Sequence, residues 1–496
     1  MYILPGIGSM LFQIIIGLVL AIPIFLKMYW VKKIEPDNKK QKCRSSKIGF
    51  ILPIMVGCFV VLSMFSSNAH RLGWDQLPAS LAIGAITGLF TWVVFYLIPL
   101  TRPASAVVSG VITLMLLTWM VYPYLIIPEM IIVSTMIVFY DIKPSHNKAV
   151  ASITYGIVAV AILITLGQTA YTKITYASDE EIPSTVVKME TTPDIYFIVP
   201  DRFTSPSAMV ESGLNPNHFV AELEARGFYV RTDAMSEDNI SPSGNAPIPT
   251  TRTLRFLASV LNMGIEIDMD IPYNRASNQV KYHMVGKILK ENGYTYHHIG
   301  HWWRETLFNP SADHNYIYKG YSMIDYFSSN ELAMAVIDRS VLRDANASSL
   351  IPFELLSRVN RERHMYQLAT FQEIAKNGEY PKFVFAHIAL PHPPYIWMKD
   401  GSVRTQTMGA MKAYLEQLQF TQGYLLRMID AVEEADSIII IQSDEGIALF
   451  SPEENEALSE NQWKGVLTAW RIPGEDIANM QEVSITKVLE FAINTR

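Results

Sequence analysis

The chain of 496 residues has only two cysteines, Cys43 and Cys58, and both lie near its N-terminus. A disulfide framework or a cysteine-based zinc site is therefore excluded from the rest of the chain. No basic block of the kind that binds nucleic acid stands out, and the net charge at neutral pH is −7. A nucleic-acid partner is therefore not expected. Internal repeats and low-complexity segments are also missing.

Outside one lysine-rich loop, charged residues are scarce before residue 171, and 50% of the whole chain is hydrophobic. Residues 1–171 are therefore predicted to form an α-helical membrane domain of six spans. The stretch Pro103–Tyr140 would be about 57 Å long as one helix, against a bilayer core of about 30 Å, so it is expected to make two spans around Pro123. The other four spans are expected near Ile7–Tyr29, Ile48–Phe65, Leu81–Leu100 and Ala149–Ala170.

Basic residues set the expected orientation of these spans. The loop after the first span is rich in basic residues between Lys32 and Lys47, and Arg102 and the loop 143–148 fall on the same side. Basic loops face the cytoplasm, so six spans place the residues after 171 outside it, whereas five would place them inside. The one charge within 103–140, Glu129, is expected at the outer interface; the alternative is a functional carboxylate within the membrane.

A polar linker, residues 172–193, leads into a second domain, residues 194–496, in which strand and helix patterns alternate. Strands are predicted at 194–200, 294–299, 383–390, 437–442 and 466–472, and helices at 218–226, 279–291, 354–376, 409–434 and 485–493. This alternation is typical of an α/β domain with a mostly parallel sheet sandwiched by helices.

Three of the predicted strands lead into polar residues. The first ends at Asp201, the four isoleucines 438–441 are followed by Asp444 and Glu445, and a third leads to His392. In a parallel sheet these side chains share the edge where ligands bind, and adjacent acids favour a bound cation. The alternatives are a solvated acidic turn, a structural histidine and a surface ion pair. His387, inside the third strand, is expected either in the core or among substrate contacts.

A threonine-rich segment, Pro249–Met263, is predicted to be a turn that opens a helix. A hydroxyl there, such as that of Thr253, faces free backbone N–H groups and the positive end of the helix dipole. This setting suits an attacking oxygen and an incoming phosphate or sulfate. The alternative is a threonine that only caps the helix.

Together these residues resemble the alkaline phosphatase superfamily, and within it sulfatase-like membrane enzymes such as lipoteichoic acid synthases and phosphoethanolamine transferases. The matching blocks are Asp194–Asp201, Phe219–Tyr229, Thr253–Met263, Phe383–Gly401 and Ile438–Gly446. They span most of the second domain, whereas the first domain matches only as a multi-span anchor. The resemblance implies Asp201 and Asp444 as metal ligands, Thr253 as a nucleophile that touches the metal, and His392 as a contact of the substrate anion.

The sequence departs from the family pattern at two positions. Glu445 stands where the family has histidine, and Arg202 follows Asp201 where a glycine is usual. With Glu445 as a ligand the metal site would consist of oxygen atoms, which favours Mn²⁺, with Mg²⁺ or Ca²⁺ also suitable, over Zn²⁺.

The resemblance implies a membrane-anchored, metal-dependent hydrolase or transferase outside the cytoplasm. Its substrates would be phosphate or sulfate esters of cell-envelope lipids or glycans, and it would act through a covalent Thr253 intermediate. His392, His387 and Arg252 would contact the substrate. The alternative, suggested by Glu445, is a catalytically inactive relative that serves as a binding or scaffold protein. A transporter is less favoured, because the predicted spans carry almost no charge.

Overall fold

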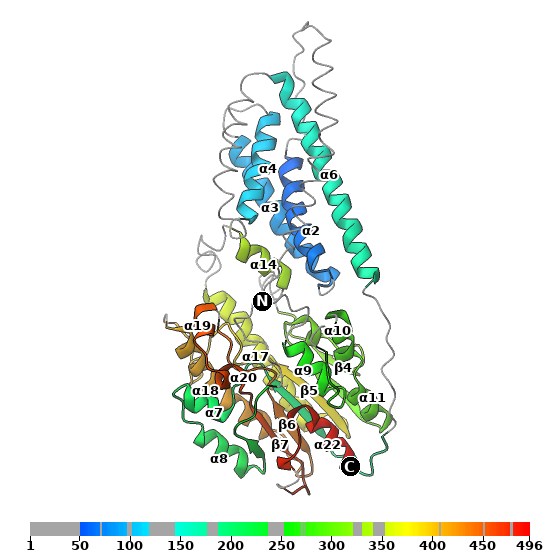
Figure 1. The fold of residues 1–496 in the computed structure, drawn as a ribbon, viewed down its shortest axis with the longest axis vertical. Coiled ribbons are helices and arrows are strands. Elements are labelled where there is room, and N and C mark those ends of the chain that lie inside the picture. The colour runs from blue at the N-terminus through cyan, green and yellow to red at the C-terminus, as the bar shows by residue number, and fades with distance from the viewer. Residues whose placement is uncertain are drawn as a thin grey trace. The chain divides into compact units, whose positions relative to one another are not determined.

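The computed structural model describes residues 50–69, 72–96, 102–118, 144–175, 187–236, 252–268, 271, 273–320, 330–340, 353–405, 408–449, 452–476 and 480–496. They belong to two compact units (Figure 1). The helical unit comprises Met1–Ala177 and Tyr321–Phe353, and the α/β unit comprises Ser178–Gly320 and Glu354–Arg496. The helical unit thus includes a segment from late in the chain, which the sequence-based division did not anticipate.

The helical unit contains four apolar helices among the described residues. They are α2 (Ile51–Ser67), α3 (Leu77–Tyr96), α4 (Arg102–Thr118) and α6 (Pro144–Thr175), with a short turn η1 (Trp74–Gln76) before α3. Within the described part, Trp74–Val94 and Ser152–Ile174 are long and apolar enough to cross a membrane, and Ile51–Ser67 and Ala106–Thr118 are shorter apolar helices. The span predicted at Ile7–Tyr29 and the one after Pro123 lie outside the described residues, so the count of six stays a prediction.

The late segment contributes α14 (Glu331–Arg339) to the helical unit. Its buried residues Leu332 and Val336 join a hydrophobic cluster with Val60 and Phe65 of α2. Asn330 caps the helix by accepting a hydrogen bond from the N–H of Ala333 at 2.8 Å, and its amide donates to the carbonyl of Gln76 at 2.9 Å. Helix α14 is therefore part of the core of this unit.

The α/β unit is built on one seven-stranded sheet of order β2-β7-β6-β1-β5-β3-β4. The strands are β1 (Ile195–Pro200), β2 (Tyr229–Arg231), β3 (Thr295–Ile299), β4 (His314–Tyr316), β5 (Lys382–Ile388), β6 (Ile438–Gln442) and β7 (Thr468–Arg471). Strands β6, β1, β5, β3 and β4 run parallel, and β7 and β2 are antiparallel. The prediction of a mostly parallel sheet is confirmed.

Helices cover both faces of this sheet (Figure 1). They are α7 (Pro206–Glu211), α8 (Asn217–Ala225), α9 (Arg252–Val260), α10 (Tyr273–Lys281), α11 (Met284–Glu291), α12 (Arg304–Leu307), α17 (Phe353–Asn377), α18 (Ala410–Ile429), α19 (Pro452–Glu456), α20 (Glu460–Lys464) and α22 (Val488–Asn494), with a short turn η2 (Ile485–Lys487) before α22. Alternate residues of a strand point to opposite faces. On one face Phe197 packs in a core with Leu254 of α9 and Leu489 of α22; on the other, Tyr196 contacts Phe371 of α17 at 5.5 Å between ring centroids.

Two predicted helices differ from those observed. The helix predicted at 279–291 is two helices, because His283 ends the first and caps the second by accepting the N–H of Gly286 at 2.9 Å. The helix predicted at 409–434 ends earlier, at Ile429. Strands β2 and β4 were not predicted, since three residues are too few to show a periodic pattern.

Candidate active site

The carboxyl ends of β1, β5 and β6 lie side by side, because Ile195 pairs with both Phe383 and Ile438. This edge brings Asp201 and Asp444 together, as expected for a parallel sheet. Asp201 is 6% exposed, and its N–H donates to the carbonyl of Ile388 at 2.9 Å. Its Oδ1 is buried and has no hydrogen-bond partner among the described residues, so it is free to bind a proton, a cation or a substrate.

Thr253 is the second residue of α9, and its hydroxyl points at Asp444. It donates a hydrogen bond of 2.5 Å to Asp444 Oδ2, while Asp444 Oδ1 accepts the N–H of Arg202 at 3.1 Å. Such a short bond to a carboxylate is typical of a charge-assisted contact. Asp444 is therefore placed to take the proton of the Thr253 hydroxyl.

Glu445 is held by two arginines. Its Oε1 pairs with Arg202 Nε at 2.7 Å, and its Oε2 pairs with Arg252 Nη2 at 2.7 Å. Arg202 also donates from Nη1 to the carbonyl of Ala448 at 2.9 Å. Its φ of 65° lies in the left-handed region that favours glycine, at a cost of about 1–2 kcal/mol for other residues. The ion pair with Glu445 gives a reason for a side chain at this position.

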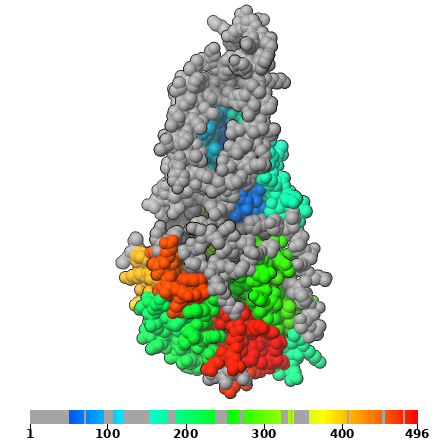
Figure 2. Space-filling model, in the orientation of Figure 1, coloured from blue at the N-terminus to red at the C-terminus, as the bar shows by residue number. Residues whose placement is uncertain are grey.

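Arg252 is positioned by α20 as well as by Glu445. Its Nη1 donates to the carbonyl of Trp463 at 3.2 Å. Helix α20 in turn packs against α7, and their orange and green surfaces meet on the face shown in Figure 2. The hydroxyl of Thr204 donates to the carbonyl of Gly465 at 3.2 Å, which ties the end of α20 to the loop after β1. The arginine beside the nucleophile thus has a fixed place.

The charges of this cluster do not cancel. Three buried carboxylates, Asp201, Asp444 and Glu445, face the two guanidinium groups of Arg202 and Arg252, so one negative charge is in excess. Burial opposes the ionised form, yet Arg252 and Arg202 lower the pKa of Glu445 to about 2. Burial and the charge of Glu445 raise the pKa of Asp444 to about 6, and burial and Asp444 raise that of Asp201 well above its usual value. The excess charge therefore resides on Asp201 and Asp444, which can share a proton.

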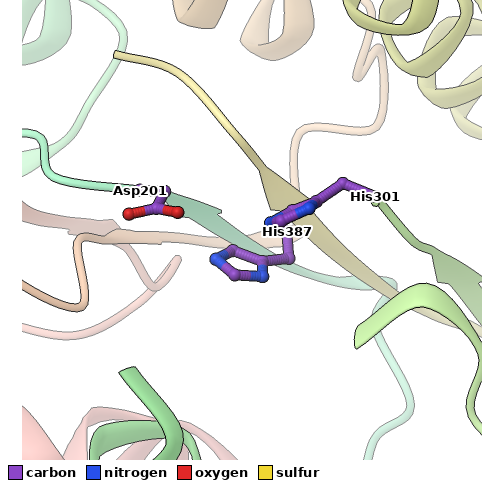
Figure 3. Close-up of side chains that lie close together, drawn as sticks. All are labelled: Asp201, His301 and His387. Atoms are coloured by element: carbon purple, nitrogen blue, oxygen red, sulfur yellow. The ribbon is translucent and has the colours of Figure 1, made fainter. Parts of the chain in front are cut away.

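A second group of polar side chains adjoins Asp201. His301 follows β3, and His387 lies in β5; one ligand atom of each lies within 4.8 Å of one on Asp201. Figure 3 shows both imidazole rings extending toward Asp201. Both Nε2 atoms are buried and lack a partner among the described residues. The sequence had indicated His387 as a core residue or substrate contact, but it had not indicated His301.

The hydrogen bonds of His301 decide what its Nε2 offers. The N–H of Trp303 donates to His301 Nδ1 at 2.9 Å, so the neutral ring carries its proton on Nε2. Burial and the neighbouring His387 hold the pKa of His301 well below its usual value, which keeps the ring neutral. A metal ligand needs a lone pair at this atom and usually donates from its other nitrogen. His301 is therefore suited to donate a hydrogen bond to an oxyanion.

His392, the remaining predicted site residue, lies in the loop after β5 and is half-buried. Its Nδ1–H donates to the carbonyl of Pro393, and its ring lies 5.8 Å from that of Trp302. The neutral ring thus keeps a lone pair on Nε2. His392 is at the predicted edge of the sheet, although no printed contact joins it to the Thr253–Asp444 pair.

Residues that could hold a divalent cation are present, because Asp201, Asp444 and Glu445 each place an oxygen within 4.8 Å of the others. The partnerless Oδ1 of Asp201 would suit a cation. Glu445 would not, since each of its oxygens already pairs with a guanidinium. The cluster therefore does not fit the four-ligand metal centre that the resemblance implies, and the choice of Mn²⁺ stays a prediction.

No protein-family model and no curated protein matches the chain. Among solved structures, the C-terminal periplasmic domain of EcEptC from Escherichia coli matches at 13% identity over 62% of this chain and 84% of that one, with a TM-score of 0.38. The integral membrane protein lipooligosaccharide phosphoethanolamine transferase A (EptA) from Neisseria meningitidis matches at 12% over 90% and 81%, with a TM-score of 0.37. A protein in the alkaline phosphatase superfamily from Vibrio parahaemolyticus matches at 13% over 60% and 67%, with a TM-score of 0.34.

The chain is similar to these proteins. Their names fall within the superfamily that its motifs resemble. At identities of 12–13% and TM-scores of 0.34–0.38 they leave its chemistry to be inferred from its own residues.

Proposed function

We propose that this protein is a membrane-anchored enzyme that transfers or hydrolyses a phosphate or sulfate ester, with Thr253 as the nucleophile. The observation that carries the proposal is the 2.5 Å hydrogen bond from the Thr253 hydroxyl to Asp444 at the start of α9. It pairs a nucleophile with a base where a helix N-terminus favours anions. The expected substrates are esters of cell-envelope lipids or glycans, and no nucleic-acid partner is expected.

In this proposal Asp444 acts as the general base. Its Oδ2 accepts the proton of Thr253, and Thr253 Oγ1 then bonds to the phosphorus or sulfur atom while the bond to the leaving oxygen breaks. The donors around the transferred group are His301 Nε2–H and the free N–H groups at the start of α9, with Arg252 nearby. Water resolves the covalent ester in hydrolysis, and an acceptor hydroxyl resolves it in transfer.

The anchor is proposed to be a multi-pass domain of about six spans in the plasma (inner) membrane, with the α/β unit outside the cytoplasm. The apolar helices of the helical unit and the basic loop Lys32–Lys47 support this orientation. Lipids of the same membrane are then within reach as substrates or acceptors. The linker predicted at 172–193 would join the two units.

Replacement of Thr253 tests the proposal. The Thr253→Ala variant should lose turnover of an aryl phosphate or aryl sulfate by at least about 1,000-fold, as expected when a nucleophile acting within a catalytic unit is removed. Wild-type protein quenched in acid during turnover should carry the phosphoryl or sulfuryl group on the peptide containing Thr253. Thr250→Ala and Thr251→Ala, in the same turn, are matched controls that should keep activity. Turnover that survives Thr253→Ala would refute this assignment.

A non-catalytic binding protein is the second candidate. The observation in its favour is that Arg202 and Arg252 occupy both oxygens of Glu445, at a position where the family pattern has histidine. This candidate predicts no turnover by the wild-type chain. It also predicts that Thr253→Ala leaves the binding of its partner unchanged.

A further inference from the structure

The two residues that depart from the family pattern are bonded to each other. Arg202 and Glu445 are far apart in sequence, yet Arg202 Nε lies 2.7 Å from Glu445 Oε1. The change at 445 exchanges a neutral imidazole for a carboxylate, and the change at 202 adds a guanidinium. The two changes thus balance in charge and meet in space.

Arg202 also reaches the other acidic group of the cluster. Its backbone N–H bonds Asp444 Oδ1 at 3.1 Å, and its side chain is only 21% exposed. The guanidinium therefore lies against the same carboxylates that would surround a cation. A second guanidinium, that of Arg252, holds the outer oxygen of Glu445.

We propose that Arg202, fixed by Glu445, supplies the positive charge that a divalent cation supplies in the family pattern, so that this site holds no divalent cation. The chemical meaning of the inference rests on the proposed function, but its physical content is about binding alone. A divalent cation bound among these oxygens would stand beside two buried guanidinium groups and repel both. It would also have to take Glu445 from an arginine, which would leave that arginine buried and unpaired.

The same arrangement gives Asp444 a different role. A carboxylate bound to a metal has its lone pairs occupied, whereas Asp444 here accepts only from Thr253 and the N–H of Arg202 among the printed contacts outside its own backbone. It can therefore accept the Thr253 proton directly. Arginine guanidinium groups, with planar sets of donors, are also well suited to the oxygens of phosphate or sulfate groups.

Metal binding by the full-length protein in detergent tests the inference. Mass spectrometry of the purified chain should find no stoichiometric Mn²⁺ or Zn²⁺, and titration with either ion should show no tight site. The Arg202→Gly/Glu445→His variant should bind one ion at least about 10–100-fold more tightly than wild type. Glycine suits the positive φ at 202, so this variant should fold. Arg202→Gly alone, which leaves three carboxylates together, should also gain affinity.

The matched control is Arg226→Gly, which removes an arginine that pairs with Glu222 and Asp430 on the surface. It should gain no ion. A stoichiometric ion in the wild-type chain that Asp444→Asn removes would overturn the inference. So would a folded Arg202→Gly/Glu445→His variant that binds no ion.

A chelator separates this inference from the proposed function. Wild-type turnover of an aryl phosphate that continues in excess chelator supports both. An ion-free chain without turnover would keep the inference and refute the proposed function. Turnover that stops when a bound ion is removed would do the reverse.

Discussion

Buried histidines should make the α/β unit sensitive to acid. His283, His364 and His387 are 0–3% exposed, and burial lowers the pKa of each to about 3. In the unfolded chain the value is about 6.5, so the unfolded state takes up protons first as the pH falls. Stability present above pH 6.5 is therefore lost as the pH falls toward 3. At pH 5 the loss is about 2 kcal/mol per histidine, or about 6 kcal/mol for the three, against a typical domain stability of about 5–15 kcal/mol.

Hydrogen exchange followed by mass spectrometry measures this loss. Amides of β3 and β5 report the opening free energy of the α/β unit within the full chain, after correction for intrinsic rates at each pH. In His283→Asn the asparagine can still cap α11 but cannot titrate, so the change in opening free energy between pH 7.5 and pH 5 should shrink by about 2 kcal/mol. His218→Asn, on the exposed side of α8, is the control and should change nothing. If His283→Asn kept the full pH dependence, the reasoning would be wrong.

Three further predictions concern the site and its location. Asp444 must be ionised to act as a base, so turnover should rise with pH and level off above about 6; Glu445→Gln removes a charge that raises the Asp444 pKa, and should move this limb of the pH–rate profile to lower pH. His301→Ala should weaken competitive inhibition by inorganic phosphate by about 10-fold through loss of one buried donor, a change visible in the inhibition constant, without loss of the folded state. A reporter fused after Arg496 should be active only if it functions outside the cytoplasm; a signal confined to the cytoplasm would contradict both the six-span count and the location.

The strands that build the site could be predicted because their residues are apolar on both faces. The run Ile438–Ile441 and the segments around β1 and β5 have no other plausible place than the centre of a parallel sheet. Their carboxyl ends then share one edge, which is why Asp201 and Asp444 could be expected together. His301 follows the predicted strand 294–299 and lies at the same edge, so the same rule would have found it had it been applied to that strand.

The partners of Glu445 could not be predicted in this way. A sequence pattern shows that a carboxylate follows β6, but not that Arg202, in the loop after another strand, turns its side chain toward it. That geometry depends on the left-handed backbone at Arg202 and on the place of α9, both of which are tertiary features. Helix 279–291 was misjudged for a similar reason, since His283 is held by Tyr296, which is remote in sequence from most of that helix.

The late segment Tyr321–Phe353 has a consequence for the order in which the chain folds. During synthesis the first part of the α/β unit, Ser178–Gly320, emerges before α14, so α2 must wait without Leu332 and Val336 against Val60 and Phe65. The α/β unit in turn lacks β5, β6 and β7 until α14 has been made. Neither unit can be completed before the other has begun. A truncated chain that starts at Ser178 would also carry α14 away from its partners and leave its apolar residues without a core.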